Sequence, residues 1–344
     1  MVRAAMLSFW HFHSKGYTEQ ALEHPDIDLV AAWDEDLERG RARAGEYQIP
    51  FTDDLDELLG RPDIDGVIVQ APTSLHHDII IKAAEAGKHV FSDKVLAPTI
   101  KEANEIVAAV DAARVVLFVG LSFLYHDYVA GVRAALKAGK IGPLVSLRIT
   151  NCHGMAVEGG LPPGFFKAEE ACGGALIDMC HAVYLVPYLL GKLPNSVYAR
   201  LGHITGREVE DNAVAIFNYA GGAHAVVEAS MVMGGAPRFL LEVHGTHGTV
   251  MFRSDSSPKG RGATVDSSFV VREGSGGGFV PAELGRPLPS PLSQWVDHIR
   301  EGKRADENLS ASLDLSRLIE AAYLSAGEGR AVALCDLDEG SVQS

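Results

Sequence analysis

The stretch GVIVQAPTSLHHDIIIKAAEAGKHVFSDK, residues 66–94, decides the fold. It opens with an apolar run at residues 66–70, continues with a helical pattern at 76–86, and returns to an apolar run at 89–91. Short, nearly continuous Val/Ile runs separated by helices predict parallel strands that are covered on both faces. Two such strands joined by a helix form a right-handed crossover, the unit of a doubly wound sheet.

The same alternation extends over the first 120 residues. Further strands are predicted at residues 2–8, 29–33 and 115–119, and helices at 17–24, 36–47, 55–59 and 100–112. We therefore expect residues 1–122 to form an N-terminal Rossmann dinucleotide-binding domain.

The pattern changes after residue 122. We expect helices at 129–138 and 175–190, and longer strands at 142–151, 197–202, 211–219, 223–231, 238–245 and 249–253. Glycine-containing turns between these strands favour a large, mainly antiparallel sheet. Residues 254–291, rich in Gly, Ser and Pro, indicate a loop or lid before closing helices at 293–300 and 310–326. Residues 123–344 are thus predicted to be an α+β domain for substrate binding and oligomerisation, whose last helices pack back near the first domain. The fold class is α/β plus α+β.

Composition narrows the class of protein. The formal net charge of −15 and the lack of a Lys/Arg cluster argue against nucleic acid as a partner. No stretch approaches about 20 consecutive apolar residues, so we expect no membrane span, and the N-terminus is not typical of a signal peptide. The four cysteines show no C-x-x-C spacing, which indicates neither a disulfide framework nor a zinc site. We expect a cytoplasmic protein.

The turn after the first strand carries no glycine. Dinucleotide-binding turns use three glycines for a tight bend and close approach to pyrophosphate, and those positions here are Ser8, Trp10 and His13. We expect these side chains, together with Phe9, to line the cofactor. Asp34 ends the second strand, where an acid binds the ribose hydroxyl and favours NAD over NADP. Two alternatives stay open: this aspartate only caps a helix, or the fold has lost its cofactor.

Two motifs in the opening stretch carry a family resemblance. Pro72 and His76 form Pro-x-x-x-His after a strand, residues 86–90 read Ala-Gly-Lys-His-Val, and Lys94 lies in the triplet Asp-Lys-Val. The chain resembles the Gfo/Idh/MocA (glucose–fructose oxidoreductase / inositol dehydrogenase) family, where that triplet is usually Glu-Lys-Pro. The resemblance implies that Pro72 and His76 contact the cofactor and that Lys94 reaches both nicotinamide and the substrate hydroxyl. Beside a positive nicotinamide we expect a depressed pKa for Lys94 and a proton-relay role; the alternative is a solvated loop lysine.

A second segment resembles the family's Gly-Gly-Gly-x-x-x-Asp-x-Gly-x-His. Here Asp178 and His181 match in type, but their spacing is one residue shorter. Residues three apart on a helix share a face, so both side chains are expected to address one pocket. His181 would act as the general base and Asp178 would orient it or hold substrate hydroxyls. The alternatives are a hydrogen-bonded structural His181 and a base one helical position away.

Other polar and aromatic residues follow the domain junction. Tyr125, His126, His153 and Phe166 are candidates for a sugar pocket, although ordinary loop packing would explain each of them equally well. His11 and His13 could bind a metal, but we interpret them as lining the pocket beside Trp10. Hydride transfer to nicotinamide needs orientation and a base, so we expect no metal.

These features point to an NAD(P)-dependent oxidoreductase that transfers hydride to or from a secondary alcohol or ketone of a sugar, cyclitol or glycoside. NAD is favoured over NADP. One alternative is a redox-neutral epimerase or glycoside-cleaving enzyme with tightly held NAD, and another is a non-catalytic ligand sensor. The expected partners are a small polyol, sugar or glycoside and further copies of the chain, as a homodimer or homotetramer.

Overall fold

The computed structural model describes residues 1–235, 238–255, 267–274 and 276–340. Its first sheet has five parallel strands in the order β2-β1-β3-β4-β5. They are β1 (Val2–Leu7), β2 (Ile27–Trp33), β3 (Gly66–Val69), β4 (His89–Ser92) and β5 (Leu117–Val119). This is the Rossmann-type sheet that the sequence predicted.

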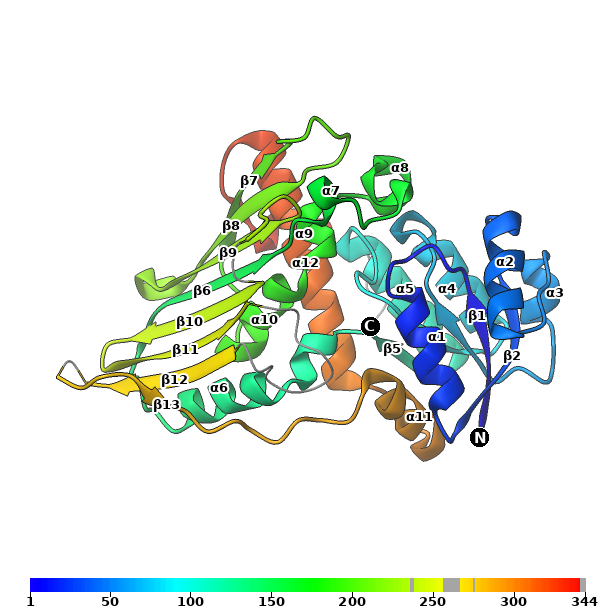
Figure 1. Cartoon of the computed structure of the whole chain (residues 1–344), viewed down its shortest axis with the longest axis horizontal. Coiled ribbons are helices and arrows are strands. Elements are labelled where there is room, and N and C mark those ends of the chain that lie inside the picture. Colours follow the sequence, from blue (N-terminus) through cyan, green and yellow to red (C-terminus); the bar gives the residue numbers. More distant parts are fainter. Residues whose placement is uncertain (236–237, 256–266, 275, 341–344) are drawn as a thin grey trace.

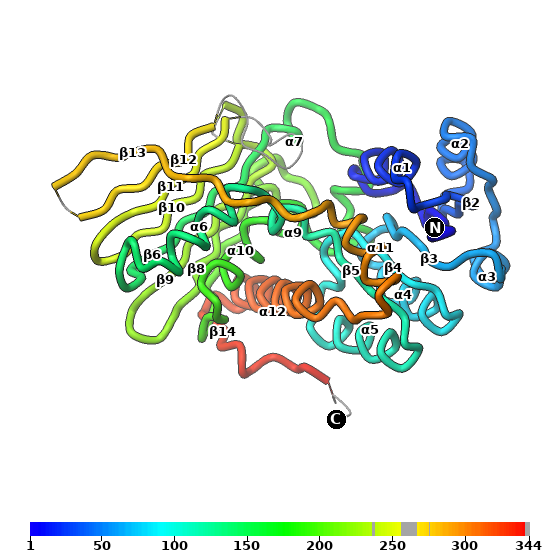
Figure 2. The backbone as a smooth tube through the Cα atoms, turned by 90° about the horizontal axis from the view of Figure 1, so that it is seen from below, coloured from blue at the N-terminus to red at the C-terminus, as the bar shows by residue number. Residues whose placement is uncertain are grey.

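Helices cover both faces of the first sheet, with α1 on one side of the strands and α4 and α5 on the other (Figure 2). The elements are α1 (Ser14–Glu23), α2 (Leu37–Tyr47), α3 (Leu55–Leu59), η1 (Thr73–Leu75), α4 (His76–Glu85), α5 (Ile100–Ala113) and η2 (Ser122–Tyr125). The strand order reverses between β1 and β3, and folds of this kind bind ligands at the carboxyl ends of the strands beside such a reversal.

A second sheet has nine strands in the order β13-β12-β11-β10-β6-β9-β8-β7-β14. Every neighbouring pair is antiparallel except β6 and β9, so the prediction of a mainly antiparallel sheet is confirmed. The strands are β6 (Leu144–Cys152), β7 (Ser196–Gly202), β8 (Asn212–Asn218), β9 (His224–Ser230), β10 (Phe239–Gly245), β11 (Gly248–Ser254), β12 (Ser267–Glu273), β13 (Val280–Pro281) and β14 (Val332–Ala333).

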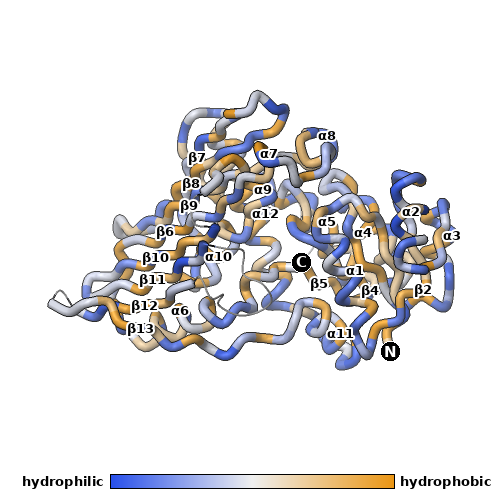
Figure 3. Tube along the Cα trace, in the orientation of Figure 1, coloured by the Kyte–Doolittle hydropathy of each residue, from blue (hydrophilic) through white to orange (hydrophobic). Residues whose placement is uncertain are grey.

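Helices α10 and α12 lie between the two sheets (Figure 1). The remaining elements are α6 (Asp127–Lys137), α7 (Met155–Glu158), η3 (Pro163–Phe166), α8 (Ala168–Ala171), α9 (Ala175–Asp178), α10 (His181–Leu190), η4 (Ala220–Gly222), α11 (Pro291–Glu301), α12 (Asp306–Glu328) and η5 (Leu334–Asp336). Helix α11 packs on the first sheet, where a β-carbon on Gly66 would lie 2.8 Å from the ring of Trp295. Hydrophobic segments gather in the interior, and hydrophilic ones follow the outer turns (Figure 3).

Two sequence expectations about the second domain were wrong, one on residues 254–291 and one on residues 175–190. Residues 254–291 are not a continuous loop, because β12 and β13 extend the sheet there; residues 256–266 and 275 lie outside the described residues. The helix expected at 175–190 is broken after Asp178. Among the described helices, none alone is long and apolar enough to cross a membrane; residues 168–178 and 181–190 pass that test only as a pair, bent by 50°.

Candidate active site

A buried charged pair connects the two sheets. Lys94 follows β4, is 2% exposed, and donates from Nζ to the main-chain oxygen of Asp178 at 2.8 Å. One carboxylate oxygen of Asp178 lies 3.5 Å from the same Nζ, and the other lies 3.2 Å from Nε2 of His153 at the end of β6. His153 Nδ1 accepts the backbone N–H of Met155, so its Nε2 is the donor to the carboxylate.

The pKa of Lys94 differs from the expectation, which was that it would be depressed. Burial alone would lower the pKa of Lys94, but the charge of Asp178, followed by that of Asp93, more than offsets burial and raises the pKa above its ordinary value. Burial would raise the pKa of Asp178, but Lys94 and then His153 hold it well below its usual range. The prediction of a depressed lysine pKa was wrong because it left out the carboxylate partner.

The expectation that Asp178 and His181 share one helix face was also wrong. Asp178 is the last residue of α9 and His181 the first of α10, and the chain bends by 50° between residues 168–178 and residues 181–190. Instead, the His181 ring stacks on Phe123 at 4.2 Å, and its Nδ1 lies 2.7 Å from the Tyr184 hydroxyl. Burial and then the charge of Lys94 hold the pKa of His181 well below its ordinary value, so this imidazole is neutral.

The glycine-free turn keeps part of the geometry that glycine would supply. Ser8 has φ 72°, in the left-handed region that favours glycine, and its Oγ accepts the Trp10 backbone N–H at 3.1 Å. Phe9 is buried, and its ring stacks at 6.4 Å on Tyr47 of α2. The serine therefore preserves the bend, whereas the residues after it fill space that glycines would leave open.

Trp10 closes the turn against the other half of the molecule. Its indole stacks on Phe165 of η3 with centroids 4.7 Å apart, and Nε1 donates to Glu170 Oε2 at 2.7 Å. A β-carbon on Gly164 would lie 2.4 Å from that nitrogen, so glycine is needed for the indole to close. The sequence pointed to Phe166 as the pocket aromatic, but its ring lies under the guanidinium of Arg207 at 4.1 Å. Its neighbour Phe165 is the aromatic that meets Trp10, a contact that the sequence did not predict.

Asp34 is fully engaged within the protein. It accepts the backbone N–H groups of Phe9 and Asp36, both at 2.8 Å, and a two-pronged contact from Arg39 at 2.6 and 3.0 Å. Arg39 lies in the first turns of α2, and its side chain folds back onto this carboxylate. Asp36, rather than Asp34, caps α2. Both carboxylate oxygens of Asp34 are therefore occupied in this arrangement, and neither is free for the expected contact with the ribose.

The Pro-x-x-x-His motif supports the loop that carries the lysine. Pro72 is buried before η1. His76 Nδ1 lies 2.8 Å from the Val95 carbonyl and its Nε2 lies 3.1 Å from the Ala71 carbonyl. The Lys94–Val95 peptide bond is cis. His76 thus connects two backbone segments. The sequence analysis expected its ring to contact the cofactor, but both ring nitrogens face backbone carbonyls in this structure.

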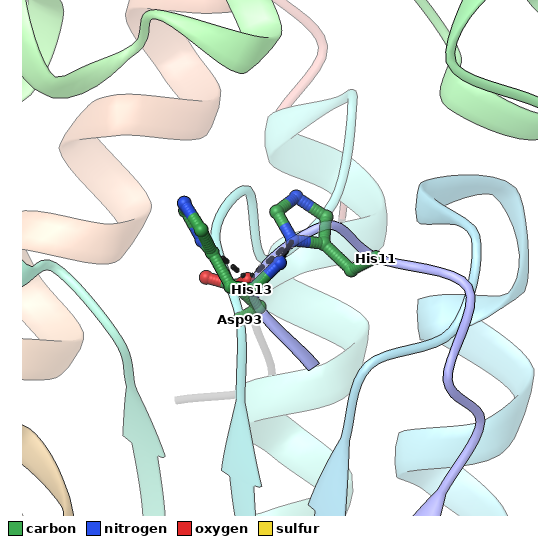
Figure 4. A group of neighbouring side chains, drawn as sticks. All are labelled: His11, His13 and Asp93. Atoms are coloured by element: carbon green, nitrogen blue, oxygen red, sulfur yellow. Dashed lines mark hydrogen bonds and ion pairs between the residues drawn. The ribbon is translucent and has the colours of Figure 1, made fainter. Parts of the chain in front are cut away.

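Two histidines of the turn converge on one carboxylate that the sequence did not assign to the site. His11 Nδ1 and His13 Nδ1 lie 2.9 and 3.0 Å from Asp93 Oδ2, and the three side chains point toward one another (Figure 4). Burial lowers the pKa of His11 to about 4. Burial would raise the pKa of Asp93, but the two imidazoles keep it well below its usual range. Asp93 stands in the triplet next to Lys94, which was the signal available in the sequence.

A large cleft lies on the α1 side of these histidines. It has a volume of about 1020 Å³ and is lined by His13, Phe123, Tyr125, His126 and residues 290–293, among others. Tyr125 and His126, both expected in the substrate pocket, are mostly buried at its wall. The Tyr125 hydroxyl accepts from Asn308 at 3.1 Å. Among the described residues, His126 Nδ1 has no hydrogen-bond partner, and burial lowers its pKa to about 4.

The crevice above the lysine pair is nearly filled. The cavity bounded by Trp10, Thr73, Lys94, Phe165 and Asp178 measures about 10 Å³. That is room for about one water molecule. A cavity of this size is far too small for any part of a dinucleotide, so a nucleotide entering this crevice would have to separate Trp10 from Phe165.

Comparison with known proteins fits this architecture. A model described as "Oxidoreductase family, NAD-binding Rossmann fold" matches residues 11–121, and one described as "GFO/IDH/MocA C-terminal domain" matches residues 129–251. Levoglucosan dehydrogenase of Pseudarthrobacter phenanthrenivorans is 30% identical over 270 residues, covering 71% of this chain and 68% of the relative.

A second relative, the NAD(+)-dependent scyllo-inositol 2-dehydrogenase of Bacillus subtilis, is 30% identical over 259 residues, covering 72% of this chain and 73% of the relative. The crystal structure of GenD2 from gentamicin A biosynthesis in complex with NAD superposes with a TM-score of 0.78 at 25% identity, covering 96% of each chain. The first domain is thus an NAD-binding Rossmann fold, and the chain belongs to the GFO/IDH/MocA family of oxidoreductases.

Proposed function

We propose that this protein is an NAD-dependent dehydrogenase or reductase acting on a secondary alcohol, or the corresponding ketone, of a sugar, cyclitol or glycoside. The observation that supports it most is the buried Lys94–Asp178 pair at the carboxyl edge of the parallel sheet. A buried ion pair is costly to maintain for stability alone, and strongly shifted groups gather at functional sites. Relatives named for levoglucosan and inositol suggest the substrate class.

In this proposal the ammonium of Lys94 donates to the substrate oxygen. Its raised pKa keeps it charged at neutral pH, so it stabilises negative charge on that oxygen rather than accepting a proton. Asp178 holds Lys94 and His153 in place, because its main-chain and carboxylate oxygens contact the lysine Nζ and its carboxylate contacts His153 Nε2. His181 is neutral and is the candidate proton acceptor. The closed crevice excludes a dinucleotide, so opening must precede turnover.

The test is a panel of sugars, polyols and glycosides with NAD, followed at 340 nm, on the wild type and two lysine variants. Lys94→Met should lower kcat by at least about 100-fold, the usual loss for a proton-transfer or oxyanion group. Lys88→Met is the matched control, because Lys88 is also buried but binds the carbonyls of Arg61 and Ile64 at the opposite end of β4. Full turnover by a folded Lys94→Met would remove Lys94 from the mechanism; absence of turnover on the whole panel, with NAD bound, would reject this substrate class.

We also propose that the outer face of the nine-stranded sheet joins two copies of the chain. Val214, Ile216, Val226, Leu240 and Met251 alternate there with charged residues and are only half-buried. Half-exposed apolar rows on a sheet face that none of the described helices covers favour association. Ile216→Glu should convert the oligomer to monomer in size-exclusion chromatography with light scattering; a wild type that is already monomeric contradicts the proposal.

A further inference from the structure

His11, His13 and Asp93 meet where β1 and β4 end, next to the Lys94–Asp178 pair. We propose that these three residues form a binding site for one divalent first-row transition-metal ion. Two imidazole nitrogens and one carboxylate oxygen are the donor set that such ions prefer, and alkaline-earth ions prefer oxygen alone.

The geometry is that of a three-ligand site. All three donor atoms lie within 4.8 Å of one another, and both histidine nitrogens lie within 3.0 Å of Asp93 Oδ2. Two ligands bound at about 2.1 Å and right angles are about 3.0 Å apart, so small shifts would place an ion between them. The other oxygen of Asp93 accepts the Lys94 backbone N–H at 2.8 Å, which fixes the carboxylate in the way that metal-binding carboxylates are usually fixed.

The contact between His11 and Asp93 needs a proton or a cation between its two atoms. The His13 backbone N–H donates to His11 Nδ1 at 3.0 Å, so this nitrogen is an acceptor, yet it faces a carboxylate oxygen at 2.9 Å. Two acceptors at that distance need a proton or a cation between them. This cluster and the adjoining Lys94–Asp178 pair together hold two buried carboxylates, Asp93 and Asp178, and one ammonium, that of Lys94. A bound cation would compensate the second negative charge.

The site is open on one side. Asp93 and His11 are buried, whereas the side chain of His13 is 34% exposed and lines the cleft of about 1020 Å³. Three protein ligands leave coordination positions for water or for a ligand oxygen entering from that cleft. This is the arrangement of metal sites that act on a bound molecule, in contrast to closed four-ligand structural sites.

The experiment measures metal on the full chain without nucleotide or sugar, so it stands even if the proposed dehydrogenase activity fails. Purified protein stripped with chelator is titrated with Zn²⁺ by calorimetry and with Co²⁺ by visible absorption. The wild type should bind one equivalent, and Asp93→Asn and His13→Ala should each weaken binding by on the order of 100-fold.

The matched control is His77→Ala, since His77 contacts the carboxylates of Asp78 and Glu105 on the surface, both at 2.9 Å, without a second histidine. It should retain the full stoichiometry and the cobalt spectrum. Circular dichroism checks that each variant folds. If Asp93→Asn does not fold, the test relies on His13→Ala, whose substitution is at a partly exposed position. A wild type that binds neither ion, or a folded His13→Ala that binds like the wild type, would overturn the proposal.

Discussion

Removing the indole of Trp10 should strengthen NAD binding even as it weakens the fold. The stack on Phe165 contributes about 0.5–1.5 kcal/mol beyond the buried area. The hydrogen bond to the carboxylate of Glu170 adds about 1.5–3 kcal/mol. Opening the crevice therefore costs about 3 kcal/mol, and the open form is populated at about 0.6%.

Because the apparent Kd is the intrinsic Kd divided by the open fraction, Trp10→Ala should lower the Kd for NAD by about 10- to 100-fold. Isothermal titration calorimetry on both proteins measures this directly. Gly164→Ala offers an independent route, since its β-carbon displaces the indole without deleting it.

The control is Leu58→Ala in α3, on the far side of the same domain. Leu58 is fully buried, so this variant should lose about 2–5 kcal/mol of stability with no change in NAD affinity. If Trp10→Ala binds NAD no better than the wild type, the stack does not control access to the crevice.

Three further predictions concern charge. Asp178→Asn leaves the ammonium of Lys94 buried without its carboxylate and should cost about 3–5 kcal/mol in urea unfolding at neutral pH; a loss below about 1 kcal/mol would contradict the pairing. Arg39→Ala frees the carboxylate of Asp34 and should raise the affinity for NAD relative to NADP, as measured by calorimetry with each nucleotide; an unchanged ratio would show that this carboxylate does not meet the ribose. Burial lowers the pKa of His126 to about 4 from 6.5, so the unfolded chain binds the extra proton and stability should fall as pH drops from 6.5 to 4, by up to about 1.4 kcal/mol per pH unit. His126→Phe should flatten the urea-unfolding profile by that amount, and an unchanged slope would assign the effect to other groups.

The fold could be predicted because its evidence is local. The apolar run at 66–69 is buried throughout and forms β3, as periodicity required. Both sheets were predicted from the spacing of such apolar runs and from the turn residues between them. The helix broken after Asp178 could not be foreseen, because most residues of 175–190 around Asp178 and His181 are apolar and fit one continuous helix. The start of α9 is fixed by a distant contact instead, since a β-carbon on Gly174 would lie 1.8 Å from the Glu210 carbonyl.

The sequence predicted which residues form the site, but it did not predict which of them contact one another. The sequence singled out Lys94, Asp178 and His153, but the contacts among them join residues 84 and 25 positions apart. Such contacts depend on how the two sheets are placed, which no local pattern encodes. For the same reason the expected partner of Asp178 was His181 rather than His153, and Phe166 was chosen where Phe165 meets Trp10.

The contact between Trp10 and Phe165 also gives this protein a built-in optical reporter. The chain has three tryptophans, of which Trp295 is fully buried under the first sheet and Trp33 ends β2. Of the three, Trp10 is the one whose ring stacks on Phe165 of η3 and whose N–H donates to a carboxylate. Separation of the stack would move this indole into water and shift its emission to longer wavelength. Stopped-flow fluorescence of the unlabelled wild type could therefore time the opening step separately from any chemistry.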